Sequence, residues 1–155
     1  MKKLKLYLET SVWNFVFADD APEKKLETRR FFEEIQSGNY ELYISELVIT
    51  EIKSAPEPLK GSLLKVVNEL EPEELIITEE VGELALKYMD SNLVPEEAFR
   101  DLVHLAVATV NNMDFLVSWN LSHIVKVKTK IGVNVINAIE GYRDLKICTV
   151  QEVLS

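Results

Sequence analysis

The sequence lacks the features of a disulfide-bonded or membrane-spanning protein. Its 155 residues contain a single cysteine, Cys148, so no disulfide can form within the chain, and the composition fits a reducing compartment. The longest apolar run, LVHLAVATV at 102–110, is too short to cross a bilayer and contains a histidine. Near the start, the apolar stretch after MKK is broken by Lys5 and stopped by Glu9, unlike a signal peptide. We therefore expect a soluble, cytoplasmic protein with no membrane partner.

Positive charge is also scarce, because 17 basic residues stand against 26 acidic ones and give a net charge of −9. This balance argues against broad electrostatic affinity for nucleic acid or anionic lipid. It does not exclude an enzyme that acts on nucleic acid, since metal ions can offset carboxylates and a few lysines can hold the phosphate backbone. With 47% hydrophobic residues, we expect one domain over 1–155 with an ordinary core.

Strand and helix patterns alternate along the chain. Strands are expected at 4–9, 40–45, 74–78, 114–119 and 145–149. Helices are expected between them at 20–38 (with Asp20 as N-cap), 45–54, 59–70, 79–91 and 95–112, and a basic stretch precedes a further segment at 132–142. Strands separated by helices indicate parallel crossover connections. We therefore predict a three-layer α/β/α fold with a mostly parallel sheet of about five strands.

Polar side chains follow several of the predicted strands at the point where each strand ends. The residues after the first, second and fourth strands are Glu9, Thr10, Ser11, Ser45, Ser118 and Asn120. The carboxyl ends of parallel strands meet at one edge of a sheet, where ligands gather. We therefore expect these residues to surround a functional site.

Two further carboxylates can reach this edge. Glu51 lies in the helix after the second strand, and Asp101 begins the apolar run 102–110, one turn before His104. If Asp101 and Glu51 meet Glu9, three like charges share a pocket and need a cation to remain ionised. Oxygen ligands without a cluster of cysteine or histidine favour Mg²⁺ or Mn²⁺. Sites of this kind hydrolyse phosphodiester bonds.

Each residue also has an ordinary structural interpretation. Glu51 could be a solvated helix residue, and Glu46 is an equally good acidic candidate in the same helix. Asp101 could complement the helix dipole, and His104 could be a hydrogen-bonded core histidine. The hydroxyl residues after the first strand could cap the next helix, and the lysines of 126–130 could form a solvated face. The order of the segments is therefore more informative than any single residue.

That order resembles the PIN domain, the metal-dependent nuclease fold that includes the VapC-like toxins of toxin–antitoxin pairs. YLETSVWN is similar to the family's opening strand end, hydrophobic-Asp-Thr/Ser-Ser. ISELVITEI resembles the second motif and places its acidic residue on Glu51, and FRDLVHLAVA resembles Asp-x-x-His-hydrophobic-Ala-x-Ala and places its Asp on Asp101. DFLVSWNLSHI resembles the fourth motif, hydrophobic-Ser/Thr-x-Asp. The similarity runs along almost the whole chain.

The chain departs from the family pattern at two positions. The first acidic residue of the family is normally Asp, and here it is Glu9, whose extra methylene moves the carboxylate by about 1.5 Å. The fourth is often Asp, and here it is Asn120, with His123 one turn later. Asn120 can offer an oxygen or position a water molecule, but it brings no charge. The site therefore contains three carboxylates at most.

The resemblance implies an endoribonuclease that is inhibited by a small antitoxin and, as in many members, forms a homodimer. Glu9, Glu51 and Asp101 would be the metal ligands and, with Asn120, the catalytic residues. Residues expected to support them or to contact substrate are Thr10, Ser11, Ser45, His104, Ser118 and His123. Candidates for holding the RNA backbone are Arg100, Lys126, Lys128 and Lys130.

Two other functions remain open. A catalytically weak or inactive PIN-fold module that binds RNA or protein is favoured by the two departures at Glu9 and Asn120. A response-regulator-like receiver would need an acidic pair after the first strand, an Asp ending the third strand and a Lys ending the fifth. The chain has Thr10 after Glu9, Ile-Thr at 77–78 and Cys-Thr at 148–149, so this third alternative ranks last.

Overall fold

The computed structural model describes residues 2–154 and contains one five-stranded sheet in which every neighbouring pair of strands is parallel. The strands are β1 (Leu4–Leu8), β2 (Tyr40–Ser45), β3 (Glu73–Leu75), β4 (Phe115–Val117) and β5 (Lys146–Cys148). Their order across the sheet is β3-β2-β1-β4-β5, so β1 is central. In register, Leu6 lies beside Leu42 of β2 and Phe115 of β4. The predicted parallel α/β architecture is confirmed.

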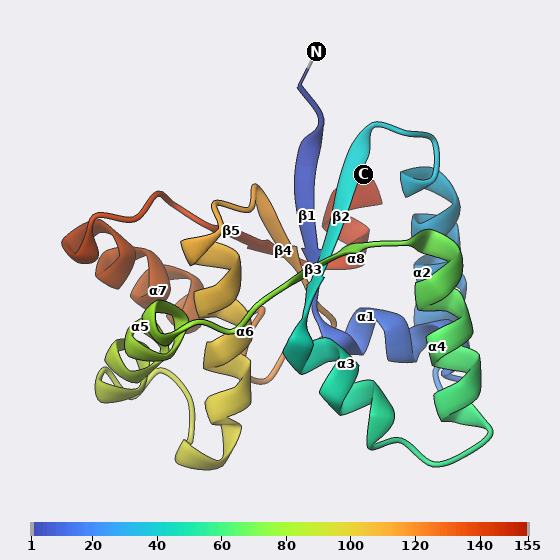
Figure 1. Ribbon diagram of the computed structural model, residues 1–155, viewed down its shortest axis with the longest axis horizontal. Coiled ribbons are helices and arrows are strands. Elements are labelled where there is room, and N and C mark those ends of the chain that lie inside the picture. Colours follow the sequence, from blue (N-terminus) through green and yellow to red (C-terminus); the bar gives the residue numbers. More distant parts are fainter. Residues whose placement is uncertain (1, 155) are drawn as a thin grey trace.

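Helices cover both faces of this sheet (Figure 1). They are α1 (Thr10–Asn14), α2 (Pro22–Ile35), α3 (Glu46–Lys53), α4 (Leu59–Leu70), α5 (Glu79–Asp90), α6 (Phe99–Val110), α7 (Val127–Glu140) and α8 (Val150–Leu154), with 3₁₀ turns η1 (Phe15–Phe17) and η2 (Glu96–Ala98). In the view of Figure 1, α5, α6 and α7 lie on the left of the sheet and α2 and α4 on the right. None of the helices within residues 2–154 is both long and apolar enough to cross a membrane.

Burial on both faces explains the composition of β1. Leu6, Tyr7 and Leu8 are all fully buried, as expected for a central strand between two helical layers. Since successive side chains of a strand point to opposite faces, Tyr7 points away from the face that Leu6 and Leu8 share. The apolar helix α6 is also buried along most of its length, as the run 102–110 predicted. The end of β1 is linked to α6 by the hydrogen bond between the Tyr7 hydroxyl and His104 Nδ1.

Three predicted element boundaries were wrong for local reasons. Ala21, not Asp20, is the N-cap of α2, and the neighbouring Asp19 forms an ion pair with Lys25 instead. The third strand is Glu73–Leu75 rather than 74–78, because Ile77 turns its backbone N–H toward the Glu46 carboxylate. The helix predicted from residue 95 begins as the separate turn η2, and α6 itself starts only at Phe99.

The starts of α1 and α7 also differ from the sequence-based expectation. Thr10 and Ser11 do not cap the helix after β1. They are its first residues, and Glu9 is the N-cap, with its side chain accepting a hydrogen bond from the Ser11 backbone N–H. The basic stretch 126–130 does not precede a helix but contributes the N-cap and first turn of α7, which runs from Val127 to Glu140.

Candidate functional site

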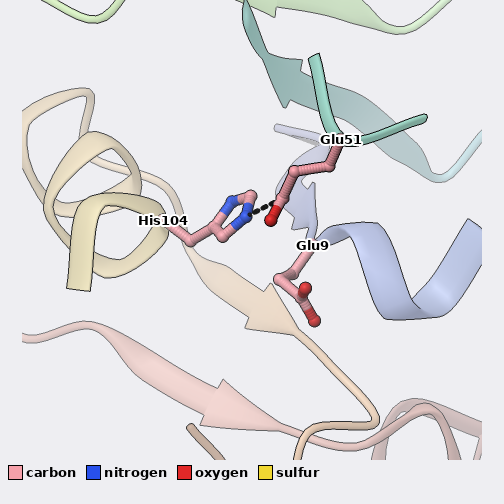
Figure 2. A group of neighbouring side chains, drawn as sticks. All are labelled: Glu9, Glu51 and His104. Carbon is pink, nitrogen blue, oxygen red and sulfur yellow. Dashed lines mark hydrogen bonds and ion pairs between the residues drawn. The ribbon is translucent and has the colours of Figure 1, made fainter. Parts of the chain in front are cut away.

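A fully buried histidine links the central strand to a carboxylate on α3. His104 of α6 places Nε2 2.7 Å from Glu51 Oε1 and Nδ1 2.7 Å from the Tyr7 hydroxyl. Figure 2 shows His104 and Glu51 pointing toward one another across the end of the sheet. Thr10 Oγ1 donates a second hydrogen bond, of 2.6 Å, to the same Glu51 oxygen. Glu51 is therefore held by groups from α1 and α6, and it is not a freely solvated helix residue.

Tyr7 extends this connection into the core. Its hydroxyl lies 2.8 Å from Ser45 Oγ, which also accepts a hydrogen bond from the Leu47 backbone N–H at the start of α3. Burial raises the pKa of Tyr7 well above its usual value, so the phenol keeps its proton. With His104 carrying its proton on Nε2, the hydrogen bonds can run from Ser45 through Tyr7 and His104 to Glu51. This buried connection fixes the direction of the Glu51 carboxylate.

Glu9 ends β1 and is held by hydroxyl groups from two elements. Its Oε1 accepts hydrogen bonds of 2.6 Å from both Ser11 Oγ and Ser118 Oγ, and its Oε2 accepts one of 3.2 Å from the Ser11 backbone N–H. Ser11 Oγ in turn accepts from the Trp119 backbone N–H, and Ser118 Oγ accepts from that of Asn120. In Figure 2 the Glu9 carboxylate is turned away from the His104–Glu51 pair. The longer side chain thus folds back to cap α1 and to join it to the end of β4.

Asp101 lies at the start of α6 and is held from the loop after β4. Its Oδ2 lies 3.0 Å from His123 Nδ1 and accepts a 3.3 Å hydrogen bond from Asn120 Nδ2. Asn120 Oδ1 accepts a hydrogen bond from the His123 backbone N–H, and this bond closes the turn between Asn120 and His123. Asn120 therefore positions Asp101 and His123. Asp101 and Glu51 both line a pocket of about 400 Å³, together with Arg100, His123 and part of 95–98.

The pKa values of the two pocket carboxylates, Asp101 and Glu51, are shifted in opposite directions. Burial raises the pKa of Asp101, the charge of Glu9 raises it further, and His123 and His104 only partly compensate. Burial also acts to raise the pKa of Glu51, but hydrogen bonds from His104 and Thr10 and the charges of His104 and Arg100 bring it below the usual value. The surroundings of Glu51 therefore stabilise its ionised form. Burial and the charge of Glu9 disfavour the ionised form of Asp101, and the neighbouring histidines only partly offset them. A cation in this pocket would favour the ionised form of Asp101.

The donor set suits a small divalent ion. Of the residues described, Glu9, Glu51 and His104 can each bring one ligand atom within 4.8 Å of the others. Carboxylate oxygens with one imidazole are compatible with Mn²⁺ and, for the oxygens, Mg²⁺. Asp101, the third ligand expected from the sequence, lies one helical turn from His104 and faces the pocket beside Glu51. Among the described residues, the group whose ligand atoms meet at this distance is therefore Glu9, Glu51 and His104, and Asp101 lies outside that group, in the pocket beside Glu51.

The remaining residues expected at the site are divided between two places. Thr10, Ser11, Ser45 and Ser118 all contact a carboxylate or the buried connection behind it, and Arg100 lines the pocket. Lys126 and Lys128 lie at the start of α7, directly after the loop that carries His123. Lys130 lies elsewhere: its Nζ is 4.0 Å from Glu152, and it lines a different pocket beside β5.

Sequence reasoning missed Tyr7. The only signal was a hydroxyl-bearing aromatic in a strand whose other core positions are leucines, and this is also compatible with simple packing. Glu46, the acidic alternative to Glu51, is exposed and accepts a hydrogen bond from the Ile77 backbone N–H, so it lies outside the group of carboxylates. The position within α3, and not the residue type, separates the two glutamates.

Asp101→Asn is expected to raise the melting temperature of the metal-free protein by a few degrees at neutral pH. The native pKa of Asp101 is raised, so its ionisation opposes folding above that pKa, and the neutral amide removes this penalty. The gain should disappear as the pH falls through the native pKa, because the parent carboxyl is then protonated as well. Thermal unfolding in EDTA across pH 4 to 8 measures this.

Glu97→Gln is the matched control, since Glu97 is an exposed carboxylate lining the same pocket one turn earlier. It should leave the melting temperature nearly unchanged. Equal stabilisation by both variants would mean that general charge reduction, and not the position of Asp101, is responsible.

Comparisons with known proteins support the fold. No protein-family model and no curated protein matches the sequence. A chain of VapBC2 from Rickettsia felis, solved bound to a DNA fragment from its promoter, aligns with a TM-score of 0.58 at 16% identity and covers 94% of this chain and 98% of that one. VapC20 from Mycobacterium tuberculosis, a sarcin-ricin loop cleaving toxin, aligns with a TM-score of 0.60 at 15% identity. The alignment covers 76% of this chain and 92% of that one. At these identities the likeness concerns the fold alone, and the chain shares the PIN-like α/β fold of these two solved structures.

Proposed function

We propose that this protein, with its VapC-type PIN fold, is a divalent-metal-dependent endoribonuclease and the toxin of a toxin–antitoxin pair. The observation that carries the proposal is the convergence of Glu9, Glu51 and His104, with Asp101 beside them, at the carboxyl edge of the sheet. One structural neighbour, VapC20, is a sarcin-ricin loop cleaving toxin, which supports the choice of substrate. The single domain 1–155 would act on cytoplasmic RNA and be inhibited by a small antitoxin protein.

Mg²⁺ or Mn²⁺ fits the site, because burial and, after it, the charge of Glu9 raise the pKa of Asp101, so that a cation would favour its ionised form, and because the donors are mainly oxygens. Glu9, Glu51 and Asp101 would hold the ion, and His104, whose two ring nitrogens already bond Tyr7 and Glu51, would orient Glu51. When bound, such an ion polarises a phosphoryl oxygen and lowers the pKa of a water molecule that attacks phosphorus.

The protein's own residues set the geometry of this site. Thr10 and His104 orient Glu51, while Ser11 and Ser118 orient Glu9. Asn120 and His123, from the loop after β4, hold Asp101 in place. His123 is about one-third exposed and is the imidazole that a substrate phosphate can reach.

Cations near the pocket offer a path for the RNA backbone. Arg100 lies in the pocket itself, and Lys126 and Lys128 follow the His123 loop at the start of α7. Because the chain is acidic as a whole, these local charges would position RNA more than attract it from a distance. Lys130 is a weaker candidate, since its ammonium group faces Glu152.

Incubation of the purified protein with a mixed RNA pool tests the proposal. We expect discrete cleavage products with Mn²⁺ or Mg²⁺ and none in EDTA, because the three carboxylates require a cation to bind a phosphodiester. Mn²⁺ in the absence of RNA should also raise the melting temperature of the parent, and it should raise that of Asp101→Asn less. Cleavage that persists in EDTA would exclude the metal-dependent reaction.

The alternative is a PIN-fold module that binds RNA or protein with little catalysis. It is favoured by one observation: the Glu9 oxygens already accept hydrogen bonds from Ser11 and Ser118, which leaves fewer lone pairs for a metal. Saturable RNA binding without products under any metal condition would support this alternative and contradict the nuclease proposal.

A further inference from the structure

The hydroxyl of Tyr7 lies between two other buried polar groups. It is 2.8 Å from Ser45 Oγ and 2.7 Å from His104 Nδ1. Tyr7, Ser45 and His104 are all fully buried. A buried hydroxyl whose proton meets no acceptor lowers stability, so each of these protons should point to a neighbouring acceptor. The directions of both hydrogen bonds therefore follow from the acceptors that lie within reach.

The proton of Ser45 determines these directions. Ser45 Oγ accepts a 3.2 Å hydrogen bond from the Leu47 backbone N–H, and the acceptor within reach of its own proton, among the residues described, is the Tyr7 oxygen. Ser45 therefore donates to Tyr7, and Tyr7 donates its single proton to His104 Nδ1. Because Nδ1 accepts, the imidazole carries its proton on Nε2, which donates to Glu51 Oε1 at 2.7 Å.

This path of hydrogen bonds begins and ends on the same helix. Ser45 is the N-cap of α3, and Glu51 lies within α3 itself. Between them the path crosses β1 at Tyr7 and α6 at His104. The rings of Tyr7 and His104 also pack together, with centroids 5.8 Å apart. The imidazole is thus held at both nitrogens, by Glu51 on one side and by Tyr7 on the other.

We infer that Tyr7 is a positioning residue for the Glu51 carboxylate and acts through His104. The inference rests on the proposed metal-dependent function, in which Glu51 holds the ion. Groups that orient a metal ligand from behind are important for binding, and their loss typically lowers metal affinity by about tenfold to a hundredfold. Without the Tyr7 hydroxyl, His104 Nδ1 becomes a buried acceptor without a partner, and the ring is hydrogen-bonded at one nitrogen alone. The carboxylate then loses its fixed direction.

The variant Tyr7→Phe tests the inference, because it removes the hydroxyl and keeps the ring. We expect its affinity for Mn²⁺ to be about tenfold lower than that of the parent, measured without RNA from the electron paramagnetic resonance signal of the free ion. Parent-like Mn²⁺ affinity in Tyr7→Phe overturns the inference, and the proposed function stands if the parent cleaves RNA. A parent that binds no Mn²⁺ contradicts both the inference and the proposed metal site.

Tyr88→Phe is the matched control. Tyr88 is also fully buried, and its hydroxyl bonds Thr109 of α6 and Asn137 of α7. Each variant loses one buried, hydrogen-bonded hydroxyl, so both melting temperatures should fall by similar amounts. Tyr88→Phe should nevertheless bind Mn²⁺ like the parent. An equal loss of Mn²⁺ affinity in both variants would assign the effect to general destabilisation and overturn the role of Tyr7.

Nuclear magnetic resonance of the imidazole nitrogens tests the hydrogen-bond directions in the parent itself. The chain contains two histidines, so the signals of His104 can be assigned by comparison with His123→Gln. We expect His104 to carry a proton on Nε2 and none on Nδ1. A proton on Nδ1 would show that Tyr7 does not donate to His104, and this result overturns the inference whatever the variants do.

Discussion

Glu51→Gln is expected to lower RNA cleavage by about a hundredfold to a thousandfold in the presence of Mn²⁺. The amide keeps the size of the side chain and an oxygen that can accept from Thr10 and His104, so the hydrogen bonds around it can persist. What is lost is the negative charge that would hold the ion. Cleavage rates of the two proteins on the same RNA, at saturating metal, measure the difference.

Stability gives an independent readout for the same variant. The native pKa of Glu51 is lowered, so its ionised form adds stability above its unfolded pKa, and this contribution is lost as the pH falls through the native pKa. Glu51→Gln should therefore lower the melting temperature slightly at neutral pH, whereas Asp101→Asn should raise it. The opposite signs distinguish the two carboxylates even if the protein cleaves no RNA.

Glu46→Gln is the matched control for this prediction, since Glu46 lies on the same helix, five residues earlier, and is exposed. It should retain the parent cleavage rate. If Glu46→Gln abolishes cleavage and Glu51→Gln does not, the functional carboxylate of α3 has been assigned to the wrong residue.

If the protein cleaves RNA as proposed, Glu9→Asp is expected to reduce its preference for Mn²⁺ over Mg²⁺ by about tenfold. The Glu9 carboxylate is drawn toward Ser11 and Ser118, and its position is displaced relative to an aspartate by about 1.5 Å. Mg²⁺ requires near-ideal octahedral geometry, so a displaced oxygen should impair its use more than that of Mn²⁺. The parent should therefore work better with Mn²⁺, and the shorter side chain should improve the Mg²⁺ rate. Cleavage rates measured with each metal give the ratio.

Glu9→Gln completes this comparison, because it keeps the length of Glu9 and removes its charge. It should lose activity with both metals, while Glu9→Asp should not. Parent-like rates in both variants would remove Glu9 from the site. Absence of cleavage in every variant, with binding of RNA or a protein partner retained, would favour the binding-module alternative.

The general architecture could be predicted from the sequence because it depends on local patterns that repeat along the chain. Alternating residues in 4–9 and 40–45 and helical spacing between them imply a parallel sheet, whichever way the side chains finally turn. The same patterns place Glu9, Ser45 and Ser118 at strand ends, and strand ends of a parallel sheet share one edge. Composition alone also indicated a chain without internal disulfides.

The connections within the site depend on contacts between residues that are distant in sequence. His104 looked like either a core residue or a ligand. The structure makes it a buried residue whose two nitrogens meet Tyr7, 97 positions away, and Glu51, 53 positions away. No local pattern specifies such a pair, since the direction of each side chain is set by the packing of α6 against the sheet. The turning back of Glu9 toward Ser118 has the same origin.

The sequence by itself therefore determined the order of the elements, the edge at which polar residues collect and the identity of most of those residues. Only the tertiary structure decided which carboxylate is stabilised as an anion and that Lys130 faces Glu152 and not the pocket. It also decided that the apolar face of α7 formed by Val127, Ile131, Val135 and Ile139 is exposed. Periodicity reports which residues of a helix share a face. Which face is buried depends on the partners that fill the space around it, and here Asn137 and Asn134 bond the interior and leave the apolar face to solvent.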